Sequence, residues 1–521
     1  MAHSPRITLY VIFTCMLAGA GGLVYGYDLV AAGGISAMDD FLVKFFPNVY
    51  KSRNAFHQGN YCRYDNQVFQ LFSSSLYIAA LLTSFVAGSL TRKLGHRSSM
   101  RTAGALFIAG TILGTFAHNL PILIIGRLLL GCGLGFSNQA IPLYISEIAP
   151  ARYRGTLNMF FGISIGLGIF AGNLVSYLAS SVRPSGWRIT QAMTSFPAFT
   201  ITLAGFALAD TPTFLIRTNK HEQALQVLRK LRGHNDVMAE FEDLLKATQI
   251  AEQVEAQNSY RALFRKRNAP QFMMAILFPL FQQFSGNDAI VFYGPFLFRA
   301  AGLGERASLF STLFTGISVL AGSVISIFSI DKAGRKTLLL LSTLIMLFCM
   351  VAAGTIFAVG IKGAVTRLSG AASGFELATV CLYLASFSAS WGPLAWIIPS
   401  EILSQNIRSA GQSVTVFTNM LFKFVIAQTF LSMLCSFKFA TFFFFAGWLF
   451  LMAIFALLFV PETKAIPIDE MVDRVWGTHW FWRYFVTAPQ KAGGPRLASV
   501  EMKPSFEPPI AAPITVHPGD L

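Results

Sequence analysis

Apolar runs of about twenty residues recur along most of the chain, and short polar segments separate them. A helix of this length crosses the hydrocarbon core of a bilayer. The pattern predicts an all-α polytopic membrane protein with twelve transmembrane helices, near residues 7–38, 68–90, 98–117, 121–145, 156–181, 187–209, 270–300, 307–330, 336–360, 373–399, 409–433 and 438–460. We expect the first run to remain in the mature protein, because it contains Asp28 and is too long for a signal peptide.

Three longer polar segments interrupt this pattern. Residues 39–67 form a loop after the first span, and residues 210–269 space Leu, Val and Phe among charges in a way that predicts helices. The segment after residue 460 is Pro-rich towards its end, and we expect disorder beyond Tyr484. The predicted domains are a six-helix half (1–209), a helical linker (210–269), a second six-helix half (270–460) and a tail (461–521).

Two motifs occur twice, in the same order in both halves. SEIAPARYRGT at 146–156 matches SEILSQNIRSAG at 400–411, and TRKLGHR at 91–97 matches DKAGRK at 331–336. Two parallel repeats of six spans are typical of the major facilitator fold. The two longer motifs share charged residues at the same offset: Glu147, Arg154, Glu401 and Arg408. We interpret these residues as an inner gate of salt bridges; simple anchoring of the topology is the alternative.

The charged residues support the assignment as a membrane protein and indicate which loops face the cytosol. Only 12% of the residues are charged, whereas 54% are hydrophobic, and the formal net charge is +15. The basic residues cluster in short loops such as 91–97 and in the segment 217–267. This positive-inside pattern places those loops in the cytosol, and an even number of spans places both termini there as well. Topology therefore explains the excess positive charge, and we expect no nucleic-acid partner.

One acidic residue lies deep in the first run. Asp28 is ten residues before Met38, a depth of roughly 15 Å at the helical rise. Arg127 is six residues inside Pro121 in the fourth run, roughly 9 Å deep. A carboxylate in lipid costs free energy unless it is protonated, paired or hydrated, so we predict a proton site at Asp28 with Arg127 as its partner. A closed ion pair that only fixes helix packing is the alternative.

The seventh run combines helix breakers with polar side chains. The breakers are Pro279, Gly286, Gly294 and Pro295, and the polar side chains are Gln282, Gln283, Asn287 and Asp288. A broken helix exposes backbone polar groups, which belong where they line a cavity. Amides donate and accept hydrogen bonds, so this cluster suits a neutral polyhydroxyl ligand. Hydrogen bonding between helices is the alternative for one of the glutamines.

Two tryptophans extend this hypothesis to the tenth run. Trp391 and Trp396 lie close to Gly392 in SWGPLAWIIPSE, and Asn419 is an isolated amide in the eleventh run. An indole face beside amides can hold the apolar C–H face of a sugar. Core packing is the alternative for either tryptophan. Two of the six cysteines, Cys62 and Cys435, fall in connections predicted to face outside, where a disulfide or two free thiols are both possible.

Taken together, these motifs resemble the plant sugar transport protein family of proton–monosaccharide symporters. The motifs are GYD, YCRYDNQ, GRLLLG, PARYRGT, QQFSG, SWGPLAWIIPSE, IRSAGQS, IAQTFLSMLCSFKFATFFFF, PETK and VWGTHWFW, within about residues 7–485. The resemblance implies that Asp28 is the proton site and Arg127 its partner. It implies that Cys62 and Cys435 form a disulfide that tethers an extracellular lid over the proton site. With the polar cluster, the predicted substrate-binding residues are Tyr25, Gln282, Gln283, Asp288, Gly392, Trp396 and Asn419.

The chain departs from the family pattern at three positions of the implied sugar site. Gly162 stands where the family has Gln, Asp288 stands where it has Asn, and Val319 stands where it has Asn. Each lost hydrogen bond weakens sugar binding by roughly 0.5–1.5 kcal/mol. Asp288 is either a second titrating group or a protonated donor, and we expect the protonated donor.

We therefore expect a proton-coupled symporter that imports monosaccharides such as glucose across the plasma membrane by alternating access. We expect it to act as a monomer, with protons as the coupling ion and no other cofactor. The alternatives are a proton-coupled transporter of a polyol, pentose or other small solute, and a transport-deficient sugar sensor. Outside the spans the sequence contains no nucleophile–base set and no metal-ligand spacing, so we expect neither an enzyme nor a metal site.

Overall fold

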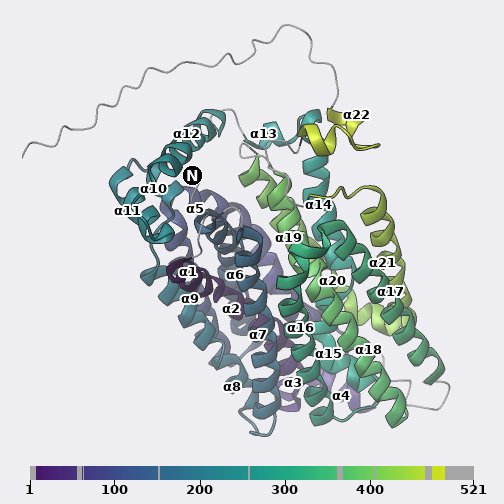
Figure 1. Cartoon of the computed structure of the whole chain (residues 1–521). Coiled ribbons are helices and arrows are strands. Elements are labelled where there is room, and N and C mark those ends of the chain that lie inside the picture. The colour runs from purple at the N-terminus through teal and green to yellow at the C-terminus, as the bar shows by residue number, and fades with distance from the viewer. Residues whose placement is uncertain are drawn as a thin grey trace, which may run out of the picture.

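The computed structural model describes residues 8–55, 62, 64–150, 153–255, 259–360, 368–403, 407–463 and 472–486. The chain is helical over most of this range, which contains no strand (Figure 1). The all-α class predicted from the apolar runs is therefore confirmed. The predicted disorder beyond Tyr484 concerns residues that lie almost entirely outside the described range.

Helices in the first half correspond in position to the first six predicted spans. They are α1 (Leu9–Gly19), α2 (Gly21–Ala37), α5 (Gln67–Thr115), α6 (Leu120–Ile148), α7 (Arg154–Ala179), α8 (Gly186–Ala192) and α9 (Ser195–Ala207). Those of the second half are α14 (Ala269–Phe284), α15 (Asn287–Ala300), α16 (Glu305–Ala333), α17 (Arg335–Gly360), α18 (Gly370–Ala389), α19 (Trp391–Ile402), α20 (Arg408–Phe437) and α21 (Ala440–Leu458).

Nine helical segments of the described residues are long and apolar enough to cross a membrane. One of them is α5, whose 49 residues include the second predicted span and nearly all of the third. The sixth and seventh predicted spans are each divided into shorter helices, α8 with α9 and α14 with α15. The structure is therefore consistent with twelve spans. The helix breakers of the seventh run act at Gly286, whose φ of +87° is a left-handed conformation that favours glycine.

The helices of the two halves form two bundles that lie side by side (Figure 1). Across their boundary α7 packs against α16, α5 against α20, and α2 against α15. The last contact is close because Gly33 has no side chain: a Cβ there would lie 2.1 Å from the carbonyl oxygen of Phe292. At Gly26 a Cβ would lie 2.0 Å from the carbonyl oxygen of Ile165 on α7. The glycines of α2 thus allow this helix to pack closely against both bundles.

Short helices lie at the two ends of the bundles (Figure 1). One end carries α10 (Pro212–Arg217), α11 (His221–Arg232), α12 (Met238–Glu255), α13 (Ser259–Leu263) and α22 (Arg483–Val486), and the other carries α3 (Asp39–Phe45) and α4 (Pro47–Ala55). The helices predicted within 210–269 are therefore present. Leu228 and Phe241 pack in a small core of their own between these helices. Below, the first end is called the linker end and the second the lid end.

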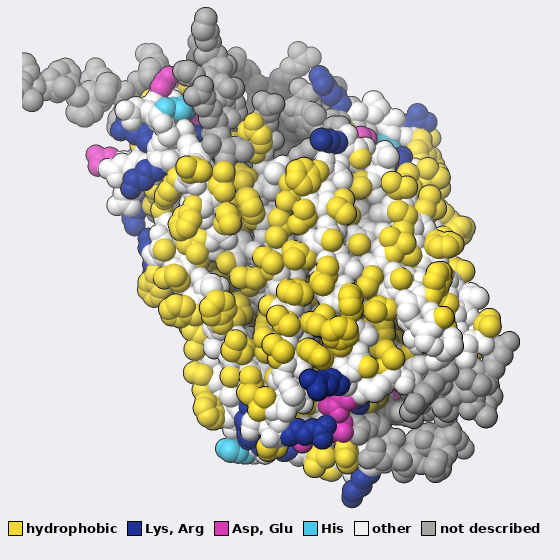
Figure 2. Space-filling model, turned by 60° about the horizontal axis from the view of Figure 1, so that its bottom comes forward, with side chains coloured by type: hydrophobic (Ala, Val, Ile, Leu, Met, Phe, Trp, Pro, Cys, Tyr) yellow, Lys and Arg dark blue, Asp and Glu magenta, His cyan; other side chains and the backbone are white. Residues whose placement is uncertain are grey.

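The lateral surface of the bundles is apolar. Figure 2 shows hydrophobic side chains spread over a wide face, with charged side chains gathered towards its upper and lower ends. Large side chains such as Phe196, Phe348 and Phe450 are more than half exposed. In water a continuous apolar face of this kind would promote aggregation, whereas a bilayer solvates it. The surface therefore agrees with a multi-pass membrane protein.

Candidate functional site

Asp28 of α2 and Arg127 of α6 form a buried ion pair. Arg127 Nη1 lies 2.8 Å from Asp28 Oδ1 and 3.0 Å from Oδ2, and the two residues are only 2% and 6% exposed. The Arg127 Nε also donates to the carbonyl oxygen of Phe72, at 3.4 Å. The structure therefore brings together the two residues predicted for proton coupling. Each charge is compensated inside the bundle, so protonation of Asp28 would remove the partner that holds the guanidinium.

Aromatic side chains from the lid end cover this pair. The Arg127 guanidinium carbon lies 5.1 Å from the centroid of the Phe72 ring, and the Phe72 ring centroid lies 5.3 Å from that of Phe41 on α3. Phe46, next to α3, also packs on Phe72. The segment between α2 and α5 therefore shields the pair from solvent at the lid end.

A disulfide joins Cys62, in the predicted external loop, to Cys435 near the end of α20. These cysteines are 373 residues apart in the sequence, so the bond connects the loop of the first half to the second half. Tyr64 strengthens the same connection, because its hydroxyl accepts a hydrogen bond from Arg299 of α15 at 2.7 Å. The loop is thus attached to both halves.

A cavity of about 1390 Å³, including its open part, lies between the two halves. Its walls come from α2, α6 and α7 of the first half and from α14, α15, α16, α18, α19 and α20 of the second. All the predicted substrate-binding residues line it: Tyr25, Gln282, Gln283, Asp288, Gly392, Trp396 and Asn419. Ser146, Asn158 and Arg408 line its part nearest the linker end. The cavity is therefore a shared space to which both halves contribute polar side chains.

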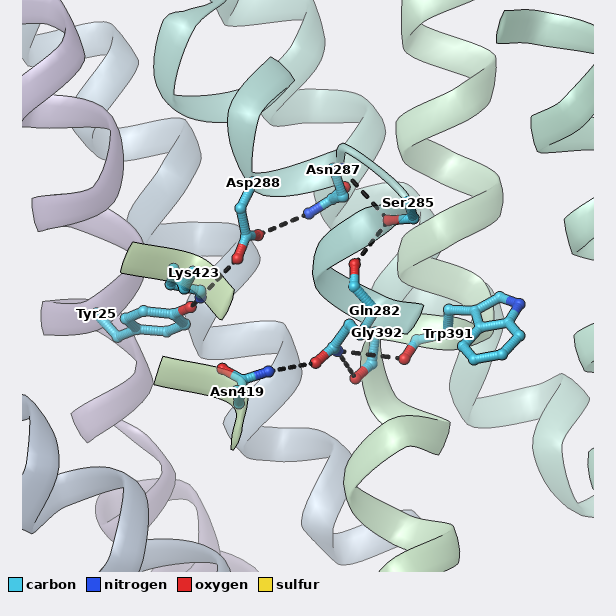
Figure 3. Close-up of polar contacts among 9 residues, drawn as sticks. All are labelled: Tyr25, Gln282, Ser285, Asn287, Asp288, Trp391, Gly392, Asn419 and Lys423. Carbon is cyan, nitrogen blue, oxygen red and sulfur yellow. Dashed lines mark hydrogen bonds and ion pairs between the residues drawn. The ribbon is translucent and has the colours of Figure 1, made fainter. Parts of the chain in front are cut away.

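Gln282 is held firmly by hydrogen bonds at the cavity wall (Figure 3). Its Oε1 accepts from Asn419 Nδ2 at 2.8 Å, and its Nε2 donates to the carbonyl oxygens of Trp391 and Gly392 at 3.3 and 3.1 Å. These contacts tie α14 to α19 and α20. Gln282 therefore positions the wall and orients Asn419, whose Oδ1 has no hydrogen-bond partner among the described residues.

Asp288 forms an ion pair that the sequence analysis missed. Lys423 Nζ of α20 lies 2.6 Å from Asp288 Oδ2 and donates a hydrogen bond to the hydroxyl of Tyr25 on α2 (Figure 3). The expectation of a protonated donor at Asp288 took no account of this neighbouring lysine. The signal was present in the sequence, because Lys423 is a lysine inside an apolar run, four residues after Asn419.

The two tryptophans have different roles. Trp396 lines the cavity. Trp391 is fully buried, its indole Nε1 donates to Thr343 Oγ1 at 2.7 Å, and its ring packs near Phe278. The hypothesis that the Trp391 ring holds a sugar is therefore wrong, and core packing is the correct alternative. Its backbone carbonyl nevertheless helps to hold Gln282.

The departures from the family pattern lie on the cavity wall. Gly162 of α7, Val319 of α16 and Asp288 all line the cavity. A Cβ on Gly162 would meet nothing within 4 Å, so the space that a larger side chain would need is open. These three residues therefore set the lining of the cavity where the family pattern has amides.

The predicted gate residues lie at the linker end, and two of them form ion pairs within their own half. Glu147 Oε1 lies 3.5 Å from His96 Nε2, and Glu401 Oε1 lies 3.0 Å from Arg335 Nη2. Arg408 lines the cavity. The side chain of Arg154 lies outside the described residues. His96 was not predicted as a partner, although it stands in the repeated motif TRKLGHR.

Two helical bundles around a central polar cavity, with a buried ion pair beside it, define a membrane transporter of the major facilitator fold. Residues 14–476 match the model of the family described as "Sugar (and other) transporter", and the chain belongs to this family. This membership confirms the predicted transporter class and the prediction that the chain is not an enzyme.

Relatives and solved structures agree with this assignment. The chain is 46% identical to Sugar transport protein MST4 of Oryza sativa subsp. japonica, over 92% of this chain and 93% of the relative. It is 45% identical to Sugar transport protein 13 of Arabidopsis thaliana, over 92% of each. Among solved structures, the proton:xylose symporter XylE matches with a TM-score of 0.73 and 24% identity, over 88% of this chain and 98% of XylE. The resemblance to plant sugar transport proteins is therefore confirmed, and XylE shares the fold.

Proposed function

We propose that this chain is a proton-coupled symporter that imports monosaccharides, such as hexoses, by alternating access. The names of the plant relatives support sugar as the substrate class. The cavity supports it chemically, because amides, a tyrosine and a tryptophan around an enclosed space suit a ligand with many hydroxyl groups and an apolar C–H face.

The observation that carries this proposal lies on α2. Tyr25 lines the sugar cavity, and Asp28, three residues further along the same helix, pairs with Arg127. Residues three apart in a helix are neighbours, so a movement of α2 displaces both at once. Because Gly26 and Gly33 hold α2 against α7 and α15, the same helix also contacts both bundles. Proton occupancy at Asp28 and sugar occupancy at the cavity are therefore coupled through one rigid element.

The proposed cycle starts with the cavity open to the outside and Asp28 protonated. Neutral Asp28 no longer holds Arg127, and this state accepts sugar. Closure over the sugar rocks residues 1–209 against residues 270–460, with 210–269 as the linker. After release of the sugar and the proton to the cytosol, the ionised carboxylate pairs again with Arg127. The gate residues Glu147, Arg154, Glu401 and Arg408 would change partners during this movement.

The geometry corresponds to the stage at which the cavity faces the linker end. At the lid end the halves are in contact: Arg299 Nη2 donates to the carbonyl oxygen of Ala37 at 2.9 Å, and Asn173 Nδ2 donates to that of Thr312 at 2.8 Å. The cavity lining continues to Ser146 and Arg408, close to the linker end. A paired Asp28–Arg127 in this stage agrees with a carrier that has released its proton.

The experiment that tests this function is uptake of labelled glucose at acidic pH by cells that lack hexose transport. Wild-type protein is expected to accumulate glucose with a dependence on the proton gradient. Asp28→Asn is expected to abolish accumulation, whereas Asp243→Asn, on the exposed face of α12, should leave it unchanged. Accumulation by the Asp28→Asn variant at the wild-type level would remove Asp28 from the mechanism, and sugar binding without any uptake would favour a sensor.

We further propose that the protein acts as a monomer in the plasma membrane with both termini in the cytosol, and that it needs no cofactor besides protons. The basic residues near the linker end support this orientation through the positive-inside rule. The disulfide supports an oxidising environment at the lid end. Protease protection of tags at the two termini in intact cells tests the orientation.

A further inference from the structure

Lys423 is a buried cation inside the sugar cavity. It lies on α20, is 3% exposed and lines the cavity together with Asp288 and Tyr25. Its Nζ lies 2.6 Å from Asp288 Oδ2 and donates to the Tyr25 hydroxyl (Figure 3). The same ammonium lies 4.7 Å from the centroid of the Tyr25 ring and 5.6 Å from that of Tyr77. Three side chains from three helices thus converge on this cation.

The pair of Lys423 and Asp288 is electrically neutral and internally satisfied. The second carboxylate oxygen of Asp288 accepts from Asn287 Nδ2 at 2.9 Å. A buried charge without a partner costs several kcal/mol, so either residue alone would be unfavourable here. Together they give the cavity two charge-assisted hydrogen-bonding groups without a net charge.

The other polar atoms around the pair define what a ligand must offer. Gln283 Oε1, Asn287 Oδ1 and Asn419 Oδ1 are buried oxygens without a hydrogen-bond partner among the described residues. Each is an acceptor, so a ligand that displaces water from these atoms must offer a donor in its place. Hydroxyl groups supply donors. A ligand carboxylate supplies none, and it would compete with Asp288 for Lys423.

We propose that Lys423 is a specificity-determining residue, which neutralises Asp288 so that the cavity accepts neutral monosaccharides and rejects sugar acids and amino sugars. This inference rests on the proposed function, since it names the charge class of the monosaccharide. Removal of Asp288 alone leaves an unpaired ammonium that attracts an anionic sugar. Removal of Lys423 alone leaves an unpaired carboxylate that attracts a cationic sugar. Removal of both restores a neutral site.

The test compares binding to purified protein in lipid nanodiscs, without a proton gradient, by ligand-induced thermal stabilisation. The probes are glucose, galactose and xylose as neutral sugars, glucuronate as the acid, and glucosamine at pH 6 as the cation. Wild-type protein is expected to respond to a neutral sugar and to neither charged sugar. Asp288→Asn restores the amide of the family pattern but leaves Lys423 without its ionic partner. It should therefore weaken neutral-sugar binding by roughly tenfold or more and gain a response to glucuronate. Lys423→Gln should weaken neutral-sugar binding by a similar factor and gain a response to glucosamine.

Two further variants separate charge pairing from misfolding. The double variant Asp288→Asn with Lys423→Gln should regain neutral-sugar affinity relative to both single variants and respond to neither charged sugar. Lys438→Gln, which removes an exposed lysine just after the end of α20, should behave as wild type. A double variant as defective as the single variants overturns the inference. So does a wild-type protein that responds to a charged sugar or to no neutral sugar. Intact neutral-sugar binding without proton-driven uptake would overturn the proposed function alone.

Discussion

Gly95 and Gly334 occupy equivalent positions in the two halves, and both have a φ of +85°. Each stands in the repeated motif between two spans and is followed by a side chain that reaches a glutamate. In the first half His96 pairs with Glu147, and in the second Arg335 pairs with Glu401. The sequence repeat is therefore also a repeat of backbone conformation and of ion pairing. The difference is chemical, since a titratable histidine replaces a permanent cation.

We predict that His96 makes stability at the linker end depend on pH. Its Nδ1 faces the Ala140 carbonyl oxygen at 3.2 Å and its Nε2 faces Glu147, so the imidazolium satisfies two acceptors. Burial opposes the charge, but Glu147, the Ala140 carbonyl and Asp210 outweigh it and raise the pKa of His96. The stabilisation, on the order of 1 kcal/mol, should be complete below the ordinary value of 6.5 and be lost as pH rises through the raised pKa.

Thermal unfolding between pH 5.5 and 9 measures this effect (about one unit below and two or more above the ordinary histidine pKa). The stability difference between wild type and His96→Gln should shrink as pH rises. The His96→Arg variant, whose cation does not titrate in this range, should stay more stable than His96→Gln by the same amount at every pH. His118→Gln, at an exposed histidine, is the control. A difference that is independent of pH would show that the histidine contributes only packing.

We predict that loss of the disulfide destabilises the lid end. Cys62→Ser frees the external loop from α20, and a bond that closes so long a loop typically contributes about 2–4 kcal/mol. The apparent Tm should fall, and reductant should have the same effect on wild type but none on the variant. Cys132→Ser, at a free cysteine, is the matched control. An unchanged Tm would mean that the aromatic contacts of the loop suffice.

Helical spacing in the sequence predicted how deep a residue lies in the membrane better than it predicted which way the side chain points. The rise per residue placed Asp28 and Arg127 at similar depth, and the structure shows them paired. The rotation about a helix axis was neglected for Trp391 and Trp396, which are five residues apart and therefore point roughly 140° apart. Only one of them faces the cavity, as the structure shows.

Contacts between distant helices were the part that the sequence could not supply. The pairing of Lys423 with Asp288 joins α20 to α15, and that of His96 with Glu147 joins the turn within α5 to the end of α6. Neither partner follows from local spacing, because each depends on how whole helices pack. A charged residue inside an apolar run was nevertheless a usable signal, because a charge at this depth needs a partner at Lys423 as it does at Asp28.

We predict that Gly162→Gln strengthens monosaccharide binding. A Cβ at Gly162 meets nothing within 4 Å and points into a cavity, so the added amide has room to reach a sugar hydroxyl. One added hydrogen bond of roughly 0.5–1.5 kcal/mol corresponds to an increase in affinity of about two- to tenfold. Binding titration of neutral sugars measures it, with Gly447→Ala, also in open space, as the control. Unchanged affinity would mean that α7 does not reach the bound sugar.

The last prediction concerns the contact that closes the lid end. Gly33→Ala places a Cβ 2.1 Å from the Phe292 carbonyl oxygen, across the boundary between the halves. The resulting overpacking destabilises only the state in which the halves meet there, by about 1–3 kcal/mol. The equilibrium between the two states should therefore shift about 5- to 150-fold towards the state open at the lid end. Uptake should fall. To measure the shift, Gly162→Cys is introduced into the Gly33→Ala variant and into wild type, and both are labelled from outside with an impermeant maleimide. The labelling rate should be higher in the Gly33→Ala background, after the labelling of each protein without Gly162→Cys has been subtracted.

Gly26→Ala distinguishes a change of state from simple destabilisation. Its Cβ would lie 2.0 Å from the Ile165 carbonyl oxygen, but this contact lies within the first half and persists in every state of a rocking carrier. Gly26→Ala should therefore lower the Tm without raising the labelling rate at residue 162. In the proposed movement the α2–α15 contact opens while the α2–α7 contact stays closed. An equal labelling rate at residue 162 in the two variants would contradict this movement and therefore the rocking of one half against the other.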